Sequence, residues 1–128
     1  MKNKVLIIQA NYYKDISTAL LKSAKNELKN FAKIKIVSVP GVFEIPVVIS
    51  KNLKKYDGFV ALGCVIKGQT PHFDFISKST TVAILNISVV SKKPVGNGII
   101  TCLNKNQAIA RGKKGREAAN AVKTILSL

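Results

Sequence analysis

Residues 58–66 read GFVALGCVI, which is the most apolar run of this 128-residue chain. An uncharged run of this length is typical of a strand buried on both faces, in the middle of a parallel sheet. Thr70 and Pro71 then suit the cap and first position of a helix, which we expect to run to about Ser91. A buried strand that leads into a helix indicates an α/β fold.

Other strand-like runs lie on both sides of this segment, at residues 5–10, 34–39 and 95–102. Helix-length segments separate them. The first has Asp15 as a plausible N-cap and apolar residues at helical spacing as far as Phe31. The second covers residues 43–54, with Pro46 in its first turn. From Asn104 onward the chain is expected to be helical, with breaks near Gly112 and Gly115.

This alternation has short connections and no linker, so it predicts one domain over residues 1–128. We expect a three-layer α/β/α domain, with a four-stranded parallel sheet of the flavodoxin-like kind and helices on both faces. In such a sheet, ligands bind outside the carboxyl ends of the strands. The chemistry should therefore lie near residues 11–13, 40–44, 66–72 and 101–104.

Composition narrows the class of protein. Hydrophobic residues make up 47% and charged residues 21%, which is typical of a globular chain. No apolar run approaches the roughly 20 residues that span a bilayer, and the N-terminal residues suit a strand better than a signal peptide. We therefore expect a cytoplasmic protein without a membrane partner. Cys64 and Cys102 form no CxxC motif and the chain has a single His, so we expect two buried thiols and no metal site.

The formal net charge is +15, which could indicate a nucleic-acid partner or an anionic substrate. The basic residues are mostly lysines spread along the chain, and the only arginines are Arg111 and Arg116. Sequence-specific DNA readers usually depend on arginine. We therefore interpret the charge mainly as solvated surface and do not expect a nucleic-acid partner.

Several candidate residues fall at the predicted strand ends. Gly68, Gln69 and Thr70 join a strand to a helix, where backbone N–H groups and a hydroxyl suit a phosphate group. The spacing from Gly63 approaches a P-loop, but Gln69 stands in place of its lysine. His72 follows, and it is the side chain best suited to move protons near neutral pH.

Glu44 opens a helix and could accept hydrogen bonds from a polyol or an amine, and Tyr12 could stack on a planar ring. Arg111 suits bidentate phosphate binding, and Gly96 and Gly98 around Asn97 indicate a close backbone approach. Each also has an ordinary explanation, such as a capped turn, a helix N-terminal carboxylate, core packing or a surface arginine.

Four segments carry a family resemblance: VPGVFEIP at 39–46, ALGCVIKGQTPHFD at 61–74, PV with GIIT at 94–101, and QAIAR at 107–111. In this order and spacing they resemble the lumazine synthase family, which condenses 5-amino-6-(D-ribitylamino)uracil with 3,4-dihydroxy-2-butanone 4-phosphate in riboflavin biosynthesis. The resemblance implies a transferase-type condensing enzyme that needs no cofactor. It also implies a homo-oligomer, a pentamer or a multiple of pentamers, with sites between subunits and with riboflavin synthase as a possible downstream partner.

The resemblance also implies a division of labour. His72 would transfer protons, and the phosphate would be bound by Gly68, Gln69, Thr70 and a neighbouring subunit's Arg111. The pyrimidine ring and ribityl chain would contact Tyr12, Val42, Phe43, Glu44, Cys64, Val65, Ile66 and the neighbour's Asn97.

The chain also departs from the family pattern. Gln69 replaces a usual Glu, Lys67 a frequent Arg, Asn97 a common aromatic and Leu103 a common acidic residue. The connection at residues 112–115 is short, and so is the arm before the first strand, which favours a pentamer or a pair of pentamers over a shell. Two alternatives to the enzyme remain open: a non-catalytic pentamer that binds a flavin or lumazine, and a basic nucleic-acid-binding protein.

Overall fold

A single sheet of four strands organises the protein. The computed structural model describes residues 2–68 and 72–128. The strands lie in the order β2-β1-β3-β4, with β1 at Asn3–Ala10, β2 at Ala32–Val39, β3 at Gly58–Ile66 and β4 at Val95–Cys102. All three strand pairings are parallel, so the four carboxyl ends meet at one edge of the sheet. The predicted bounds of β3 and β4 are confirmed, whereas β1 and β2 each begin two residues earlier than predicted.

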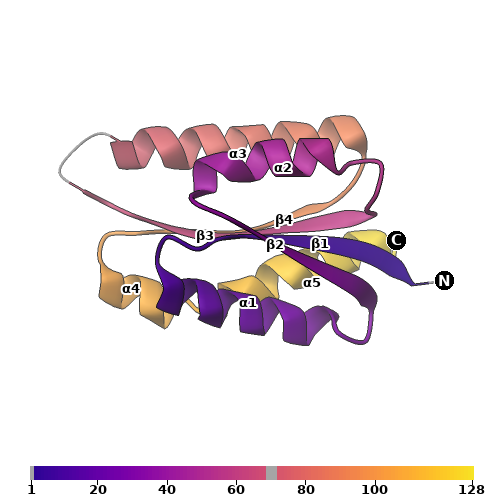
Figure 1. Ribbon diagram of the computed structural model, residues 1–128, viewed down its shortest axis with the longest axis horizontal. Helices are drawn as coiled ribbons and strands as arrows, with labels where there is room; N and C mark the ends of the chain where they lie inside the picture. The colour runs from indigo at the N-terminus through magenta and orange to yellow at the C-terminus, as the bar shows by residue number, and fades with distance from the viewer. Residues whose placement is uncertain (1, 69–71) are drawn as a thin grey trace.

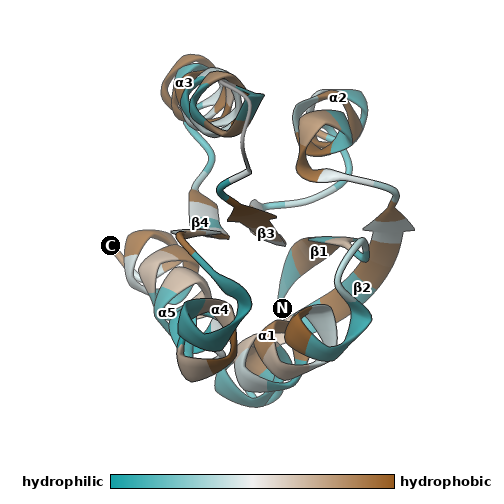
Figure 2. Ribbon diagram, turned by 90° about the vertical axis from the view of Figure 1, so that its left-hand side faces the viewer, coloured by the Kyte–Doolittle hydropathy of each residue, from teal (hydrophilic) through white to brown (hydrophobic). Residues whose placement is uncertain are grey.

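Helices cover both faces of the sheet, as Figures 1 and 2 show. One face carries α1 (Lys14–Leu28), α4 (Lys105–Ala110) and α5 (Lys114–Leu126). The other carries α2 (Ile45–Lys51) and α3 (His72–Ser91). The prediction of a three-layer α/β/α domain with a parallel flavodoxin-like sheet is confirmed.

The sheet separates two apolar cores, because successive side chains of a strand point to opposite faces. Val5 and Ile7 of β1 pack with Leu20 of α1 in one core. Leu6 and Ile8 pack with the α2 side in the other. All four of these β1 side chains are buried, as expected for a strand in the middle of a parallel sheet.

Two glycines, which have no side chain, let α5 pack closely against β4 and α1. A Cβ on Gly96 would lie 2.1 Å from the carbonyl oxygen of Ala118, and one on Gly115 would lie 2.1 Å from that of Leu20. Gly115 therefore lies inside α5 and faces α1, so the predicted break near Gly115 is wrong. The helices are interrupted at residues 111–113 instead, which confirms the predicted break near Gly112.

The boundaries of α1 differ from the prediction at both ends. Asp15 is not the N-cap: the amide of Ser17 donates to the carbonyl of Tyr13 at 2.9 Å, so the helix begins at Lys14. Asp15 lies in the first turn, 3.9 Å from the Lys105 ammonium. The helix ends at Leu28, and Phe31 packs on the core from the following turn.

The predicted helix at 43–54 is also shorter. Residues Val42–Glu44 form a 3-10 turn, η1, and α2 occupies only Ile45–Lys51, with Pro46 in its first turn as predicted. The predicted cap Thr70 and the following Pro71 lie outside the described residues.

Helix α3 is unusual because little of it is buried. Only Thr80 and Ile84 count as buried among its described residues, although the helix is 20 residues long. A window of this helix reaches a mean hydropathy of 1.3, so by length and composition alone it could cross a membrane. It contains no continuous apolar run of that length, because Asp74, Lys78 and several Ser, Thr and Asn residues interrupt the apolar ones. An apolar helix with so little cover calls for another partner.

Candidate active site

A glycine in β3 positions the turn η1 at the carboxyl edge of the sheet. A Cβ on Gly63 would lie 2.5 Å from Val42 Cγ1 and 3.2 Å from the Ala10 Cβ. Without that Cβ, Val42 packs directly on the ends of β1 and β3 and is 6% exposed. The sequence analysis did not assign this positioning role, although a glycine inside the most apolar strand was a signal for close packing.

Burial of Val42 fixes the position of the next two residues, Phe43 and Glu44. The Phe43 ring is 63% exposed, which is high for a large apolar side chain. The Glu44 carboxylate lies over Gly41, with Oε1 3.2 Å from the place a Cβ of Gly41 would occupy. The turn therefore presents an aromatic ring and a carboxylate beside the strand ends.

Two tyrosines follow β1. The rings of Tyr12 and Tyr13 meet edge to face, with centroids 4.9 Å apart and planes at 87°. Tyr13 packs on the core, and burial raises its pKa, with smaller contributions from Tyr12 and Cys64. Tyr12 is 74% exposed and keeps a free ring face.

Hydrogen bonds hold this end of β1 in place. The amide of Asn11 donates to the carbonyl of Val39 at 3.1 Å, which ties β1 to β2. The buried Ser17 hydroxyl donates to the carbonyl of Ala10 at 2.7 Å, which ties β1 to α1. Ser17 is a second positioning residue that the sequence analysis missed, because a serine inside an amphipathic helix gives no particular signal.

Strand β3 extends past β1. Its pairing with β1 ends at Leu62, opposite Gln9, but its pairing with β4 continues to Ile66, opposite Cys102. On the β1 side, the backbone of Cys64, Val65 and Ile66 therefore lies beyond the paired register. Such an edge can bond a planar ligand through backbone N–H and C=O groups.

Both cysteines are free and buried, as predicted. Burial, followed by the neighbouring Cys102 thiol, raises the pKa of Cys64 from its ordinary value of 9.0 to about 12. The nucleophile of a cysteine is the thiolate. Cys64 therefore stays a neutral thiol near pH 7 and acts through its shape and backbone.

The segment after β3 begins with a fixed backbone. The amide of Lys67 donates to the carbonyl of Cys102 at 2.8 Å, and Gly68 has open space around its Cα. Gln69 and Thr70, which complete the predicted phosphate seat, lie outside the described residues. His72 is the first residue of α3 and is exposed.

Arg111 and Asn97 lie on the β4 side of the molecule. The Arg111 guanidinium donates through Nη1 to the carbonyl of Thr101 at 2.9 Å, which holds it at the end of the edge strand. Asn97 is exposed on β4 and pairs with Ala61, five residues before the strand ends. At about 3.3 Å per residue, Asn97 lies roughly 16 Å from the carboxyl edge of its own chain.

The structure thus brings most of the predicted site residues to one edge: Tyr12, Val42, Phe43, Glu44, Cys64, Val65, Ile66, Gly68 and His72. Asn97 is not among them. A cavity beside Tyr12 and Lys105 holds only about 200 Å³, below the roughly 300 Å³ of common ligand sites. Within residues 2–68 and 72–128, no three His, Cys, Asp or Glu side chains gather in a way that could hold a metal ion.

Comparison with known proteins identifies the family. A family model described as 6,7-dimethyl-8-ribityllumazine synthase matches residues 2–128. Proteins with that name include one from Agrobacterium fabrum, 41% identical over 99% of this chain and 95% of its own length. One from Bartonella henselae is 43% identical over 99% of this chain and 88% of its own length. The match extends over nearly the whole chain, and the chain belongs to the 6,7-dimethyl-8-ribityllumazine synthase family.

Proposed function

We propose that this chain condenses 5-amino-6-(D-ribitylamino)uracil with 3,4-dihydroxy-2-butanone 4-phosphate to give 6,7-dimethyl-8-ribityllumazine, phosphate and water. It would act as one domain of residues 1–128, in the cytoplasm, as a step of riboflavin biosynthesis and without a metal or redox cofactor. The observation that carries the proposal is the meeting of VPGVFEIP, residues 39–46, with ALGCVIKG, residues 61–68, at the carboxyl edge of the sheet, where Val42 packs on Gly63.

The pyrimidine would lie at the end of β1. The exposed face of Tyr12 offers an aromatic surface for stacking on a planar ring. The open backbone edge of Cys64, Val65 and Ile66 offers hydrogen bonds to the ring's amide groups. Val42, Phe43 and Glu44 stand beside it, where the carboxylate can accept hydrogen bonds from ribityl hydroxyls or from the amine.

The phosphorylated ketone would lie at the start of α3. Gly68, Gln69 and Thr70 would bind its phosphate, which the positive end of the α3 dipole favours. His72 would transfer protons as the amine adds to the ketone and water leaves to form the imine. Phosphate is then released, and the second nitrogen closes the ring with loss of water. Both substrates carry their reactive groups, so orientation, proton transfer and a seat for phosphate suffice.

We further propose that copies of the chain assemble through α3. Phe75, Val82, Leu85 and Val89 are all exposed and form one stripe, at intervals of seven, three and four residues. This is the spacing of a helix that packs along another helix. Burying the stripe against copies of itself would remove an apolar surface from water. By the family resemblance, the assembly would be a pentamer or a multiple of pentamers.

A ring would also complete the site. Arg111 and Asn97 lie along β4, which is an edge strand, and so can face a neighbouring copy. Four of the five donors of an arginine guanidinium remain for a phosphate when one bonds a carbonyl. A neighbouring subunit's Arg111 would then approach the phosphate seat, and its Asn97 would approach the ring.

The test is to mix the purified protein with both substrates and follow lumazine formation by absorbance and fluorescence, against the uncatalysed reaction. Turnover above that background supports the proposal. A protein that binds lumazine or riboflavin but gives no turnover would instead be the non-catalytic ligand-binding pentamer. Binding can be followed by quenching of the ligand's own fluorescence, excited at wavelengths at which the protein does not absorb.

A further inference from the structure

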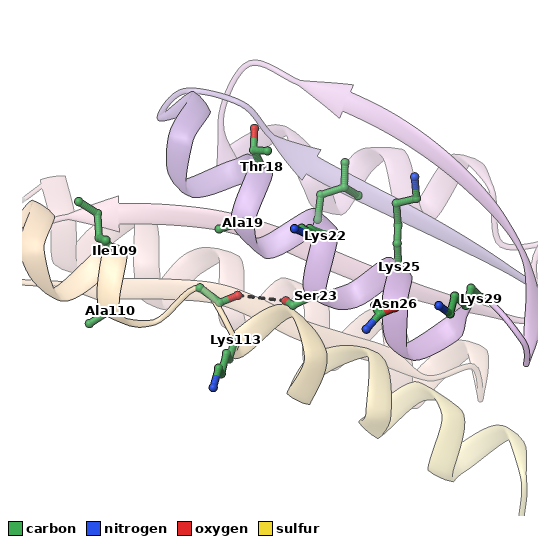
Figure 3. A pocket seen from close by; sticks show the side chains of 12 residues that line it. Thr18, Ala19, Lys22, Ser23, Lys25, Asn26, Lys29, Ile109, Ala110 and Lys113 are labelled. Atoms are coloured by element: carbon green, nitrogen blue, oxygen red, sulfur yellow. Dashed lines mark hydrogen bonds between the residues drawn. The ribbon is translucent and has the colours of Figure 1, made fainter.

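A groove of about 1030 Å³ lies between α1 and the α4–α5 connection, and none of the residues proposed for catalysis lines it. Figure 3 shows its two walls, with Lys22 and Lys25 on α1 and Ile109 and Lys113 across from them. The Ser23 hydroxyl donates to the carbonyl of Gly112 at 3.0 Å, which fixes the connection against α1.

The groove combines apolar surface with unpaired positive charge. Ala19, Leu21, Ile109 and Ala110 contribute the apolar lining, and Ile109 is 58% exposed. The charged lining residues are all lysines: Lys22, Lys25, Lys29 and Lys113.

The acidic residues of this layer are bound elsewhere. Glu27 pairs with Arg116 and Lys123, Glu117 with Lys114, and Asp15 with Lys105. Within residues 2–68 and 72–128, no ion pair includes a lysine of the groove. The protein therefore leaves a row of ammonium groups along apolar surface without an acidic partner of its own.

We propose that this groove binds an acidic amphipathic helix of a partner protein. Lys22, Lys25 and Lys29 follow one another at intervals of three and four residues on one side of α1. At 1.5 Å per residue they extend over roughly 10 Å, so carboxylates at the same intervals on a partner helix can face them. Leucine side chains of that helix would cover Leu21 and Ile109, which is how helices commonly bind in grooves.

A nucleic acid would also be attracted by the lysines, but the groove suits it less well. Bases bind by stacking on aromatic side chains or arginine, and the lining has neither. Apolar lining residues contribute to binding an amphipathic peptide and contribute little to a phosphate backbone.

The probe is a fluorescein-labelled helical peptide with a leucine stripe and Glu at i, i+3 and i+7, measured by fluorescence anisotropy with the assembled protein. Its control is the same peptide with Gln at each Glu. We expect Lys22→Glu with Lys25→Glu to weaken binding on the order of ten-fold or more, because both attractions become repulsions. Ile109→Asn should weaken it several-fold and leave binding of a single-stranded RNA oligonucleotide unchanged.

The matched control is Lys33→Glu with Lys35→Glu, which changes the net charge equally. Both residues are exposed on β2. They alternate with Ala32, Ile34 and Ile36, which pack in the core on the α1 face, so they point to the other face of the sheet, away from the groove. This variant should bind the acidic peptide like the wild type, apart from a small long-range effect. None of these measurements requires catalysis, so they stand apart from the proposed function.

Four outcomes would overturn the proposal. Equal binding of the peptide and its Gln control would show that the lysines do not attract it. Equal weakening by the two double variants would indicate attraction by net charge alone. The RNA could bind more tightly than the peptide and lose affinity in Lys22→Glu with Lys25→Glu, which would make the groove a nucleic-acid site. A change of assembly size in that variant, together with no peptide binding, would assign the groove to a contact between copies of the chain.

Discussion

His72 is the residue on which the proposed chemistry depends most. A positioned acid or base contributes roughly 100- to 10,000-fold to a rate. We expect His72→Ala to lower kcat by about 10- to 1,000-fold and to leave the native mass unchanged, because the side chain is exposed. Steady-state kinetics and native mass spectrometry measure both. Lys78→Ala, also exposed on α3, is the control, and an unchanged rate in His72→Ala would make the histidine a structural residue.

Cys64 should make the free energy of unfolding decrease as the pH rises above about 9. Its pKa is raised from 9.0 to about 12 in the folded protein, so the contribution is full below about pH 9 and is lost as pH rises toward 12. One such group lowers the free energy of unfolding by up to about 1.4 kcal/mol per pH unit. Cys64→Ala should flatten the curve over that range in chemical denaturation, whereas Cys102→Ala should keep most of the slope. Equal slopes in the wild type and Cys64→Ala would contradict the assignment.

Thr80 offers a stabilising change. Its Oγ1 is buried against the sheet side of α3 and has no hydrogen-bond partner within the described part of the chain. A buried hydroxyl without a partner costs about 1–3 kcal/mol. Thr80→Val, which keeps the shape, should raise the free energy of unfolding by about 1 kcal/mol at fixed protein concentration. Thr81→Val, at an exposed position, should change it by less than about 0.5 kcal/mol. A loss of stability in Thr80→Val would mean that water or another copy bonds the hydroxyl.

At the scale of elements, the contact between β3 and η1 should govern substrate binding. Gly63→Ala would place a Cβ 2.5 Å from Val42 Cγ1, and such overpacking costs about 1–3 kcal/mol. The turn must then move, and Phe43 and Glu44 move with it. We expect a lower free energy of unfolding and a kcat/KM for the uracil lowered about ten-fold or more.

Val42→Ala provides the matching control, because it removes the atom with which the new Cβ collides. The free energies of unfolding of the two single variants and the double variant form a cycle. Gly63→Ala with Val42→Ala should lose less stability than the sum of the two single losses. Additive losses would show that Gly63 does not position the turn.

The sequence predicted an element's bounds correctly where neighbouring residues mark them, and incorrectly where contacts with another element decide them. Strands β3 and β4 were predicted with the correct bounds, because Asp57 and Lys67 flank the apolar run of β3 and Pro94 precedes β4. The start of α1 was not, because an Asp in a first turn resembles a cap until the bond from the Ser17 amide to the Tyr13 carbonyl is known. Gly115 was predicted to break the helix. Only the packing of α5 on α1 shows that a glycine is needed there because any Cβ would collide with α1.

The candidate site was also predicted only in part. Motifs predicted which segments meet at the carboxyl edge, because all parallel strands end at the same edge. They did not predict the contacts that orient those segments: Val42 on Gly63, Tyr13 near Cys64, and Arg111 on the carbonyl of Thr101. These contacts join residues far apart in the chain, and periodicity within one element carries no information about them.

At the scale of the whole molecule, the proposed site is divided between copies, and this can be tested without a structure of the ring. His72 would act from one subunit and Arg111 from the next, as in any head-to-tail ring. Alone, His72→Ala should keep at most about a tenth of the wild-type rate. Arg111→Ala should lose activity through a raised KM, measured with the phosphorylated substrate held well below that KM. Unfolded and refolded together in equal amounts, they form mixed rings in which some interfaces carry both intact residues.

With random mixing, about a quarter of the interfaces pair an intact His72 with an intact Arg111, so about a quarter of wild-type activity should return. In one control, each variant is unfolded and refolded alone. In a second, the separately refolded oligomers are mixed, and activity should return only as fast as subunits exchange between them. Activity that stays at the level of the single variants, in mixed rings confirmed by native mass spectrometry, would place both residues in the site of one chain. The exposed edge of β4 would then need another role, and the packing of α3 would be the remaining reason for the chain to assemble.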